Sequence, residues 1–189
     1  MPAIEQVRED LDYVANAVRR EEADRGPPAV YVLWAVIVAI GFALPDFAPR
    51  HAGWYWLIVG PAGGIASWLL GRRQGIIDGV HDAALARRYA YDWLVAGAAF
   101  ILVFVPAMAG AIQPTAAAVN VLLVGGVAYA LAGVHLERPL LWSGLLMFGG
   151  YVALSLLALP YVWTATGIIV AASLAIAAVV RPRAPSPQG

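Results

Sequence analysis

The chain contains no cysteine and no lysine among its 189 residues, and charged residues make up only 13% of it. The absence of cysteine excludes disulfide bonds, thiolate metal sites and catalysis by a cysteine nucleophile. The formal net charge is zero, so the charge balance gives no indication of nucleic-acid binding. An ordinary soluble domain has about 25% charged residues. This chain therefore has too little polar side chain to cover a surface exposed to water.

Apolar residues are abundant instead, at 61% of the chain with a mean hydropathy of +0.73. Soluble domains have roughly 45–50% apolar residues, so the composition predicts an exterior that faces lipid. The most informative stretch is residues 53–73, GWYWLIVGPAGGIASWLLGRR. Aromatic residues begin it, no charge interrupts it, and two arginines end it. This pattern is typical of a membrane-spanning helix whose arginine end lies in the cytoplasm.

Similar apolar runs follow one another along the chain, so we predict an all-α, polytopic membrane protein. A six-helix transmembrane bundle is expected over residues 27–180, with spans at about 29–44, 54–71, 93–112, 116–134, 140–159 and 162–180. The first run is short, because 16 residues at 1.5 Å each cover only about 24 Å of a hydrocarbon core of about 30 Å. It is therefore either a thin span or a re-entrant hairpin.

The distribution of arginine decides between these two topologies. Six spans place eleven of the twelve arginines on one side of the membrane and leave only Arg50 on the other. If the first run does not cross, five arginines lie on one side of the membrane and seven on the other. Cytoplasmic loops carry the excess of basic residues. The sequence thus predicts six spans in a bacterial inner membrane, with both termini in the cytoplasm.

Residues 1–26 form the only long polar segment. Apolar residues recur in it at alternating spacings of three and four, which is typical of an amphipathic helix with a heptad-like stripe: Ile4, Val7, Leu11, Val14 and Val18. Its polar faces carry mixed charges, whereas a helix bound to anionic lipid is rich in basic residues. We expect this cytoplasmic helix to dock a protein partner, with packing on its own bundle as the alternative. Residues 181–189 are expected to be a disordered cytoplasmic tail.

Small residues recur at helical spacing within the predicted spans. Helices in lipid associate through close backbone approach, which small residues permit. The candidate helix-packing positions are Gly60, Gly64, Gly126, Gly149 and Gly167. Packing within one chain is the expected role, and a homodimer face is the alternative. Tryptophans near span ends are expected to anchor the helices at the membrane interface: Trp54, Trp56, Trp93, Trp142 and Trp163.

The predicted spans carry no acid or base at membrane depth, which argues against ion-coupled transport. Residues 60–64 (GPAGG) and the pair Gly149-Gly150 occupy corresponding positions if the spans form two inverted triplets. Paired broken helices of this kind indicate a midplane binding site. In span count and length the chain resembles the substrate-binding subunits of energy-coupling-factor vitamin importers. This resemblance implies a transporter, or a substrate-binding membrane subunit, that uses broken spans two and five.

The loop between the second and third spans holds Asp78-Gly79-Val80-His81-Asp82, which is similar to the carboxylate motif of CDP-alcohol phosphatidyltransferases. The similarity fails at the positions that matter. Gly75 stands where the motif requires an aspartate, and Asp82-Ala83 stands where it requires Ala-Arg. We therefore predict no catalytic residue here.

The predicted topology also places several possible metal ligands on one side of the membrane: Asp78, His81, Asp82, His135 and Glu137. No two of the histidines have the i, i+4 spacing of a helical zinc motif. We predict no metal site and no cofactor. The expected function is that of a non-enzymatic integral membrane protein, a structural, regulatory or accessory subunit. Its expected partners are membrane lipids and either another protein or a second copy of the chain, with no nucleic acid.

Overall fold

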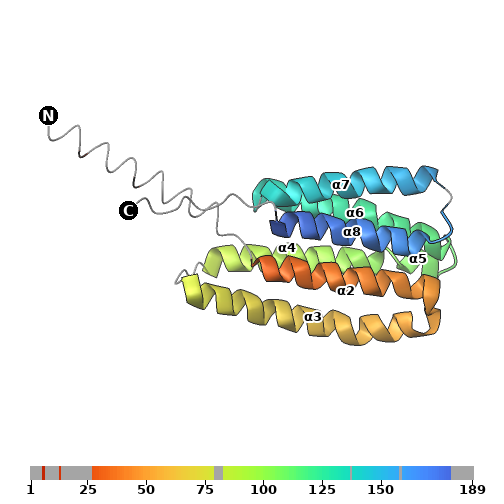
Figure 1. Ribbon diagram of the computed structural model, residues 1–189, viewed down its shortest axis with the longest axis horizontal. Helices are drawn as coiled ribbons and strands as arrows, with labels where there is room; N and C mark the ends of the chain where they lie inside the picture. The colour runs from red at the N-terminus through yellow and green to blue at the C-terminus, as the bar shows by residue number, and fades with distance from the viewer. Residues whose placement is uncertain are drawn as a thin grey trace.

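The computed structural model describes Gln6, Tyr13 and residues 27–78, 83–136, 138–157 and 159–179. Within these ranges the chain is almost entirely helical and contains no strand, which confirms the all-α prediction. The long helices lie side by side in a bundle (Figure 1). The long helices are α2 (Pro28–Phe47), α3 (Pro49–Asp78), α4 (Ala83–Leu102), α6 (Pro114–His135), α7 (Arg138–Leu156) and α8 (Val162–Val179), and the short α5 (Val105–Met108) lies between α4 and α6.

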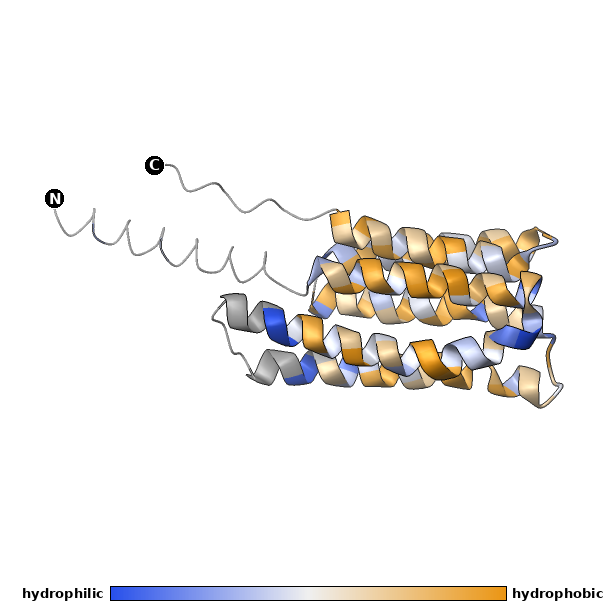
Figure 2. Cartoon of the chain, turned by 60° about the horizontal axis from the view of Figure 1, so that its bottom comes forward, coloured by the Kyte–Doolittle hydropathy of each residue, from blue (hydrophilic) through white to orange (hydrophobic). Residues whose placement is uncertain are grey.

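Five stretches of helix in the described part of the chain are long and apolar enough to cross a membrane: Pro28–Phe47, Ala90–Met108, Pro114–His135, Arg138–Leu156 and Val162–Val179. Helix α3 is not one of them, because tryptophan, tyrosine, glycine and proline take many of the places that aliphatic residues fill in the other helices. Figure 2 shows strongly hydrophilic residues near the helix ends and apolar residues along most of their length. The fold is compatible with a membrane bundle of five to six spans.

Helix α2 is longer than the sequence pattern indicates. It runs for 20 residues, from Pro28 to Phe47, through Pro45. At 1.5 Å per residue this is about 30 Å, the thickness of a hydrocarbon core. The expectation of a 16-residue first run is therefore wrong. The helix ends at Ala48, whose φ of −146° and ψ of 60° are not helical. Ala48 precedes Pro49, and the proline ring disfavours a helical conformation in the residue before it.

The predicted interruptions of the second and fifth spans are also wrong. Helix α3 continues through Pro61 for 30 residues, and α7 continues through Gly149 and Gly150. Glycine and proline weaken a helix in water, where the backbone can bond to solvent. A proline removes one backbone hydrogen bond of a helix, and in the structure α3 remains helical without it, as α7 does through its glycine pair.

The interruption lies instead in the third span, for which the sequence pattern predicts an unbroken helix over residues 93–112. Helix α4 ends at Leu102, and the short α5 follows after Val103 and Phe104. Pro106 explains the break, since it has no N–H to donate to the carbonyl group of Leu102. A turn at Gly110, where φ is +72°, then leads to α6.

Four helices form the centre of the bundle and two lie at its edges. The most extensive contacts join α6 to α7 and α2 to α8, and α8 also contacts α6 and α7. Among the described helices α3 contacts only α2, while α4 contacts α6 and α5. The large apolar side chains with less than 2% exposure all belong to the central helices: Leu122, Leu140, Met147 and Leu174.

Helices α6 and α7 lie close together because glycines of each helix contact the backbone of the other. A Cβ atom at Gly133 would collide with the backbone of Leu141. One at Gly144 would lie 2.7 Å from the carbonyl oxygen of Gly126 and 2.9 Å from the Cα of Ala130. Small residues thus set the separation of these two helices, as expected for helices that associate in lipid.

Candidate functional site

The most elaborate set of polar and aromatic contacts lies where α2 ends and α8 begins. Here Asp46 of α2 accepts two hydrogen bonds at its Oδ2 atom from Thr164 of α8. The backbone N–H of Thr164 donates over 2.8 Å and its hydroxyl group over 2.7 Å. Thr164 is the third residue of α8, so its N–H has no partner within the helix. The negative charge of Asp46 also lies at the positive end of the helix dipole. Asp46 therefore caps α8 from another helix.

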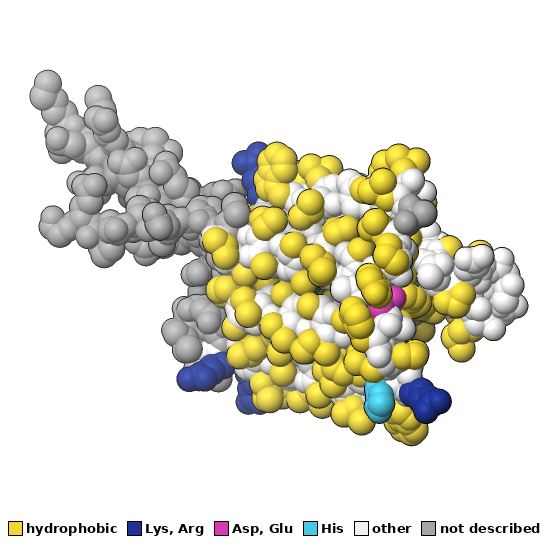
Figure 3. Space-filling view, turned by 45° about the vertical axis from the view of Figure 1, so that its right-hand side comes forward, with side chains coloured by type: hydrophobic (Ala, Val, Ile, Leu, Met, Phe, Trp, Pro, Cys, Tyr) yellow, Lys and Arg dark blue, Asp and Glu magenta, His cyan; other side chains and the backbone are white. Residues whose placement is uncertain are grey.

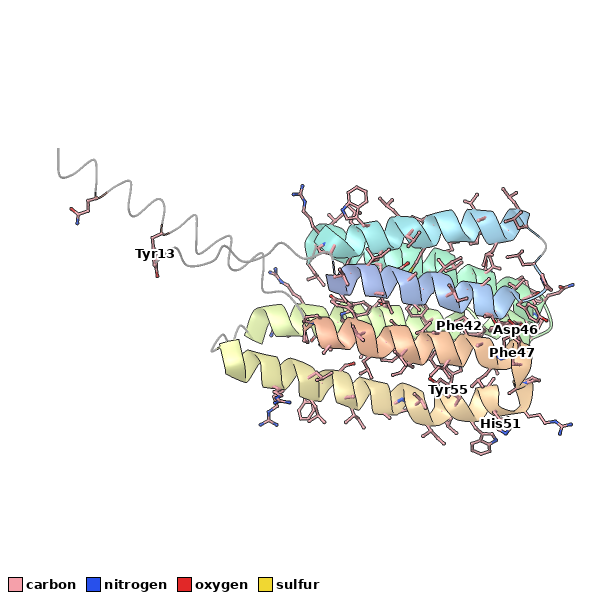
Figure 4. The ribbon with its side chains drawn as sticks, viewed as in Figure 1. Tyr13, Phe42, Asp46, Phe47, His51 and Tyr55 are labelled. Carbon is pink, nitrogen blue, oxygen red and sulfur yellow. The ribbon has the colours of Figure 1, made fainter. Side chains whose placement is uncertain are left out.

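Aromatic rings surround this cap and connect four parts of the fold. Phe42 of α2 lies 5.7 Å from Trp56 of α3 and 6.0 Å from Trp163 of α8, centroid to centroid. On its other side Trp163 stacks on Phe104, in the link between α4 and α5, at 6.0 Å. Figure 4 shows Phe42 and Asp46 at the same end of α2. We call Phe42, Asp46, Phe104, Trp163 and Thr164 the junction. It can fix helices in place but offers no nucleophile paired with a base.

The tryptophans expected at the membrane interface divide into two groups. Trp56, Trp93 and Trp163 are half-buried and pack against other rings, Trp93 against Tyr129 at 5.2 Å. Trp54 and Trp142 are exposed.

Hydrogen bonds join helix α3 to α2, and two glycines allow the two helices to approach closely. Trp34 donates its indole N–H to the hydroxyl oxygen of Ser67 over 2.8 Å, and Ser67 donates in turn to the carbonyl of Gly63 over 2.8 Å. Tyr55 donates to the carbonyl of Ile37 over 2.9 Å. Gly63 lies against Ile37, and a Cβ atom on Gly41 would meet the rings of Tyr55 and Trp56.

The predicted helix-packing glycines differ in what they face. Gly126 lies against Phe148 and the carbonyl of Gly144, and Gly167 lies against Phe42 and the carbonyl of Val38. A Cβ atom added to Gly60, Gly64 or Gly149 would have no neighbouring atom within 4 Å. In α3 and α7 the nearby glycines, Gly63 and Gly150, make the contacts instead. One residue turns a helix by about 100°, so a shift of one position moves a glycine off the contact face.

The five predicted partner-docking residues, Ile4, Val7, Leu11, Val14 and Val18, lie outside the described residues. From that segment the structure describes only Gln6 and Tyr13, each with a helical backbone and an exposed side chain. The predicted tail, residues 181–189, is also outside the described ranges.

The centre of the bundle contains a few polar side chains. Ser143 of α7 donates to the carbonyl of Ser173 in α8 over 2.8 Å, and Ser173 donates to the carbonyl of Ile169 over 2.8 Å. Thr166 is fully buried, and its hydroxyl group has no hydrogen-bond partner in the part of the chain that the structure describes.

The described residues contain no group of three or more histidine, aspartate or glutamate side chains that could hold a metal ion. The side chains of Asp78, His81, Asp82 and Glu137 are not among those described, whereas His135 is exposed at the end of α6. Comparisons with protein-family models, curated proteins and solved structures found no match to this chain.

Sequence reasoning did not identify the role of Asp46. The available signal was a lone carboxylate that directly follows a proline at the end of an apolar run, with a threonine near the start of the last run. Asp46 and Thr164 are 118 residues apart, so only a pairing of the first and last spans brings them together.

Proposed function

We propose that this chain is a non-enzymatic integral membrane protein that crosses a bacterial inner membrane six times, with both termini in the cytoplasm, and acts as an accessory subunit. The positions of exposed arginines support this topology. Arg72 and Arg73 lie toward the C-terminal end of α3, and Arg87 and Arg88 lie in the first turns of α4. Arg50 lies at the opposite end of α3. A crossing by α3 therefore separates Arg50 from the other four.

The observation that carries the accessory role is the uncovered surface of α3. Of the described helices it contacts α2 alone, and Gly63 is its only fully buried residue among those whose side chains are described. Gly64 is exposed, and Ile65 and Trp68 have 62% and 61% of their surface exposed. Since α3 is also less apolar than the other long helices, a transmembrane helix of a partner protein is a better neighbour for it than lipid alone. The amphipathic segment at residues 1–26 would provide a second contact on the cytoplasmic side.

The test is purification in a mild detergent after crosslinking in the membrane, with mass spectrometry of the proteins that are captured. Gly64→Leu places a large side chain on the open flank of α3 and should abolish capture of the partner. Gly149→Leu is the matched control, because Gly149 is equally open but lies on α7. Capture that survives Gly64→Leu, or is lost equally in both variants, contradicts this interface.

The cytoplasmic helix needs a separate experiment. Replacing Val7, Leu11 and Val14 together by aspartate removes the apolar stripe while the polar faces stay intact. We expect the captured protein to dissociate when the detergent extract is diluted. A complex that is as stable as that of the wild type shows that this helix has another role.

Transport of a small apolar or weakly polar solute is the alternative proposal. Its support is the unpaired hydroxyl group of Thr166 and the break between α4 and α5, in place of the interruptions expected in spans two and five. It predicts that Thr166→Val lowers saturable solute uptake into proteoliposomes while the protein remains folded. The accessory role predicts no saturable uptake in either protein.

A further inference from the structure

Two shallow apolar hollows lie side by side on the outer surface of α2. One has a volume of about 370 Å³ and lies between α2 and α3, lined by Ile40, Leu44, His51, Trp54, Tyr55, Ile58 and Val59. The other has a volume of about 340 Å³ and lies on α2, lined by Ala39, Ile40, Ala43, Leu44 and Phe47. Ile40 and Leu44 belong to both, so their side chains form a ridge with one hollow on each flank.

The first hollow has a length suited to an acyl chain. It extends along α3 from His51 to Val59, which is eight steps of 1.5 Å or about 12 Å. One leaflet of a hydrocarbon core is about 15 Å thick. Its floor is fixed, because the ring of Tyr55 is held by the hydrogen bond to the carbonyl of Ile37.

The polar end of the hollow carries an exposed arginine that forms no ion pair in the described part of the chain. Arg50 is exposed next to His51, and no carboxylate in the described part of the chain forms an ion pair with it. Asp46 is the nearest acidic residue in the sequence, and its Oδ2 atom accepts hydrogen bonds from Thr164. Figure 3 shows an arginine and a histidine together at one corner of a mainly hydrophobic face. Trp54, 66% exposed, lies one turn along, where an aromatic ring suits the membrane interface.

We propose that the two hollows and Arg50 form a binding site for one anionic phospholipid. Its phosphate group contacts Arg50 and accepts a hydrogen bond from His51. Its two acyl chains lie on either side of the Ile40–Leu44 ridge, one in each hollow. Arg50 always carries its charge and presents several donors to a phosphate. The site is separate from the open flank of α3 along the helix axis, because the hollow ends at Val59 and the flank residues Gly64, Ile65 and Trp68 follow it.

Native mass spectrometry of the purified full-length protein tests the head-group contact. The probes are phosphatidylglycerol and phosphatidylethanolamine with identical acyl chains. One basic residue at a membrane surface favours the anionic lipid about fivefold, and we expect this preference in the wild type. Arg50→Gln should remove the preference. Arg73→Gln, which neutralises an exposed arginine near the other end of α3, should retain it. Equal retention of both lipids by the wild type, or equal effects of the two variants, overturns the proposal.

The hollows are tested with two independent measurements. Leu44→Trp should fill both hollows and reduce retention of both lipids about equally, with monodisperse elution as the check of folding. In the unmodified protein, phosphatidylglycerol with a photoreactive group in one acyl chain should label the peptide that contains residues 51–59. Labelling centred on α4 or α6 overturns the proposal. So does a crosslinked dimer that protects residues 51–59, because a second copy would then occupy the surface.

Discussion

The carboxylate of Asp46 is the clearest single-residue contribution to the fold. Its replacement by alanine removes two charge-assisted hydrogen bonds from Thr164, each of a type that contributes about 1.5–3 kcal/mol. Because both bonds share one part-buried acceptor atom, we expect Asp46→Ala to lower the free energy of unfolding by less than their sum, about 2 kcal/mol. Asp46→Asn should lower it by less, since the amide oxygen can still accept. Thermal unfolding in detergent measures the effect. Asp92→Ala changes an exposed aspartate in α4 and should have little effect; an equal loss in both would contradict the capping role.

Removal of the hydroxyl groups of Thr166 and Ser143 should change the free energy of unfolding in opposite directions. Thr166 buries a hydroxyl group without a partner, which costs about 1–3 kcal/mol, so the similarly shaped valine should stabilise the protein by about 1 kcal/mol. Ser143→Ala removes a bond to the carbonyl of Ser173 and should destabilise by about 0.6 kcal/mol, the average for such bonds between membrane helices. Equilibrium unfolding of the two variants under the same conditions compares them. Destabilisation by Thr166→Val would mean that its hydroxyl group does have a partner.

At the scale of the helices, the glycines of α7 provide a matched pair. A methyl group on Gly144 meets the backbone of α6, so Gly144→Ala should cost about 1–3 kcal/mol, the usual range for overpacking. In Gly149→Ala the added methyl group has no neighbouring atom within 4 Å, so the substitution should stabilise the protein by about 0.5–1 kcal/mol through helix propensity. Thermal unfolding distinguishes them. If both substitutions stabilise the protein, α6 and α7 are not in close contact.

The helix positions were largely predictable from the sequence, because apolar runs and their proline or charged boundaries are local features. The contact faces were not. Gly149 and Gly150 are adjacent and identical in the sequence, yet only Gly150 lies against Ile169. Which of two adjacent glycines faces a neighbour depends on the rotation of the whole helix, and packing partners decide that rotation. The break at Val103–Phe104 was not predictable from Pro106 alone, since α2 continues through Pro45 and α3 through Pro61.

At the scale of the whole molecule, the number of crossings is open to a direct test because the chain has no cysteine. Single variants Arg50→Cys, Arg73→Cys and Arg138→Cys introduce one thiol each. In intact cells an impermeant maleimide should label only the Arg50→Cys variant, and the other two should react after the cells are opened. Labelling of both the Arg50→Cys and Arg73→Cys variants from outside would show that α3 does not cross, which would contradict the six-span topology. Labelling of the Arg73→Cys variant without the Arg50→Cys variant would contradict the orientation.

The extensive pairing of α2 with α8 has a consequence for how the protein is made. Asp46 leaves the ribosome 118 residues before Thr164. At about 5–20 residues per second, α2 waits for roughly 6–24 s before its main neighbour is synthesised. During that time the nascent chain has only α3 to shield the surface of α2. A chain that stops before residue 160 never completes this pairing, so we expect it to be degraded, whereas the loss of residues 181–189 leaves both helices of the pair intact.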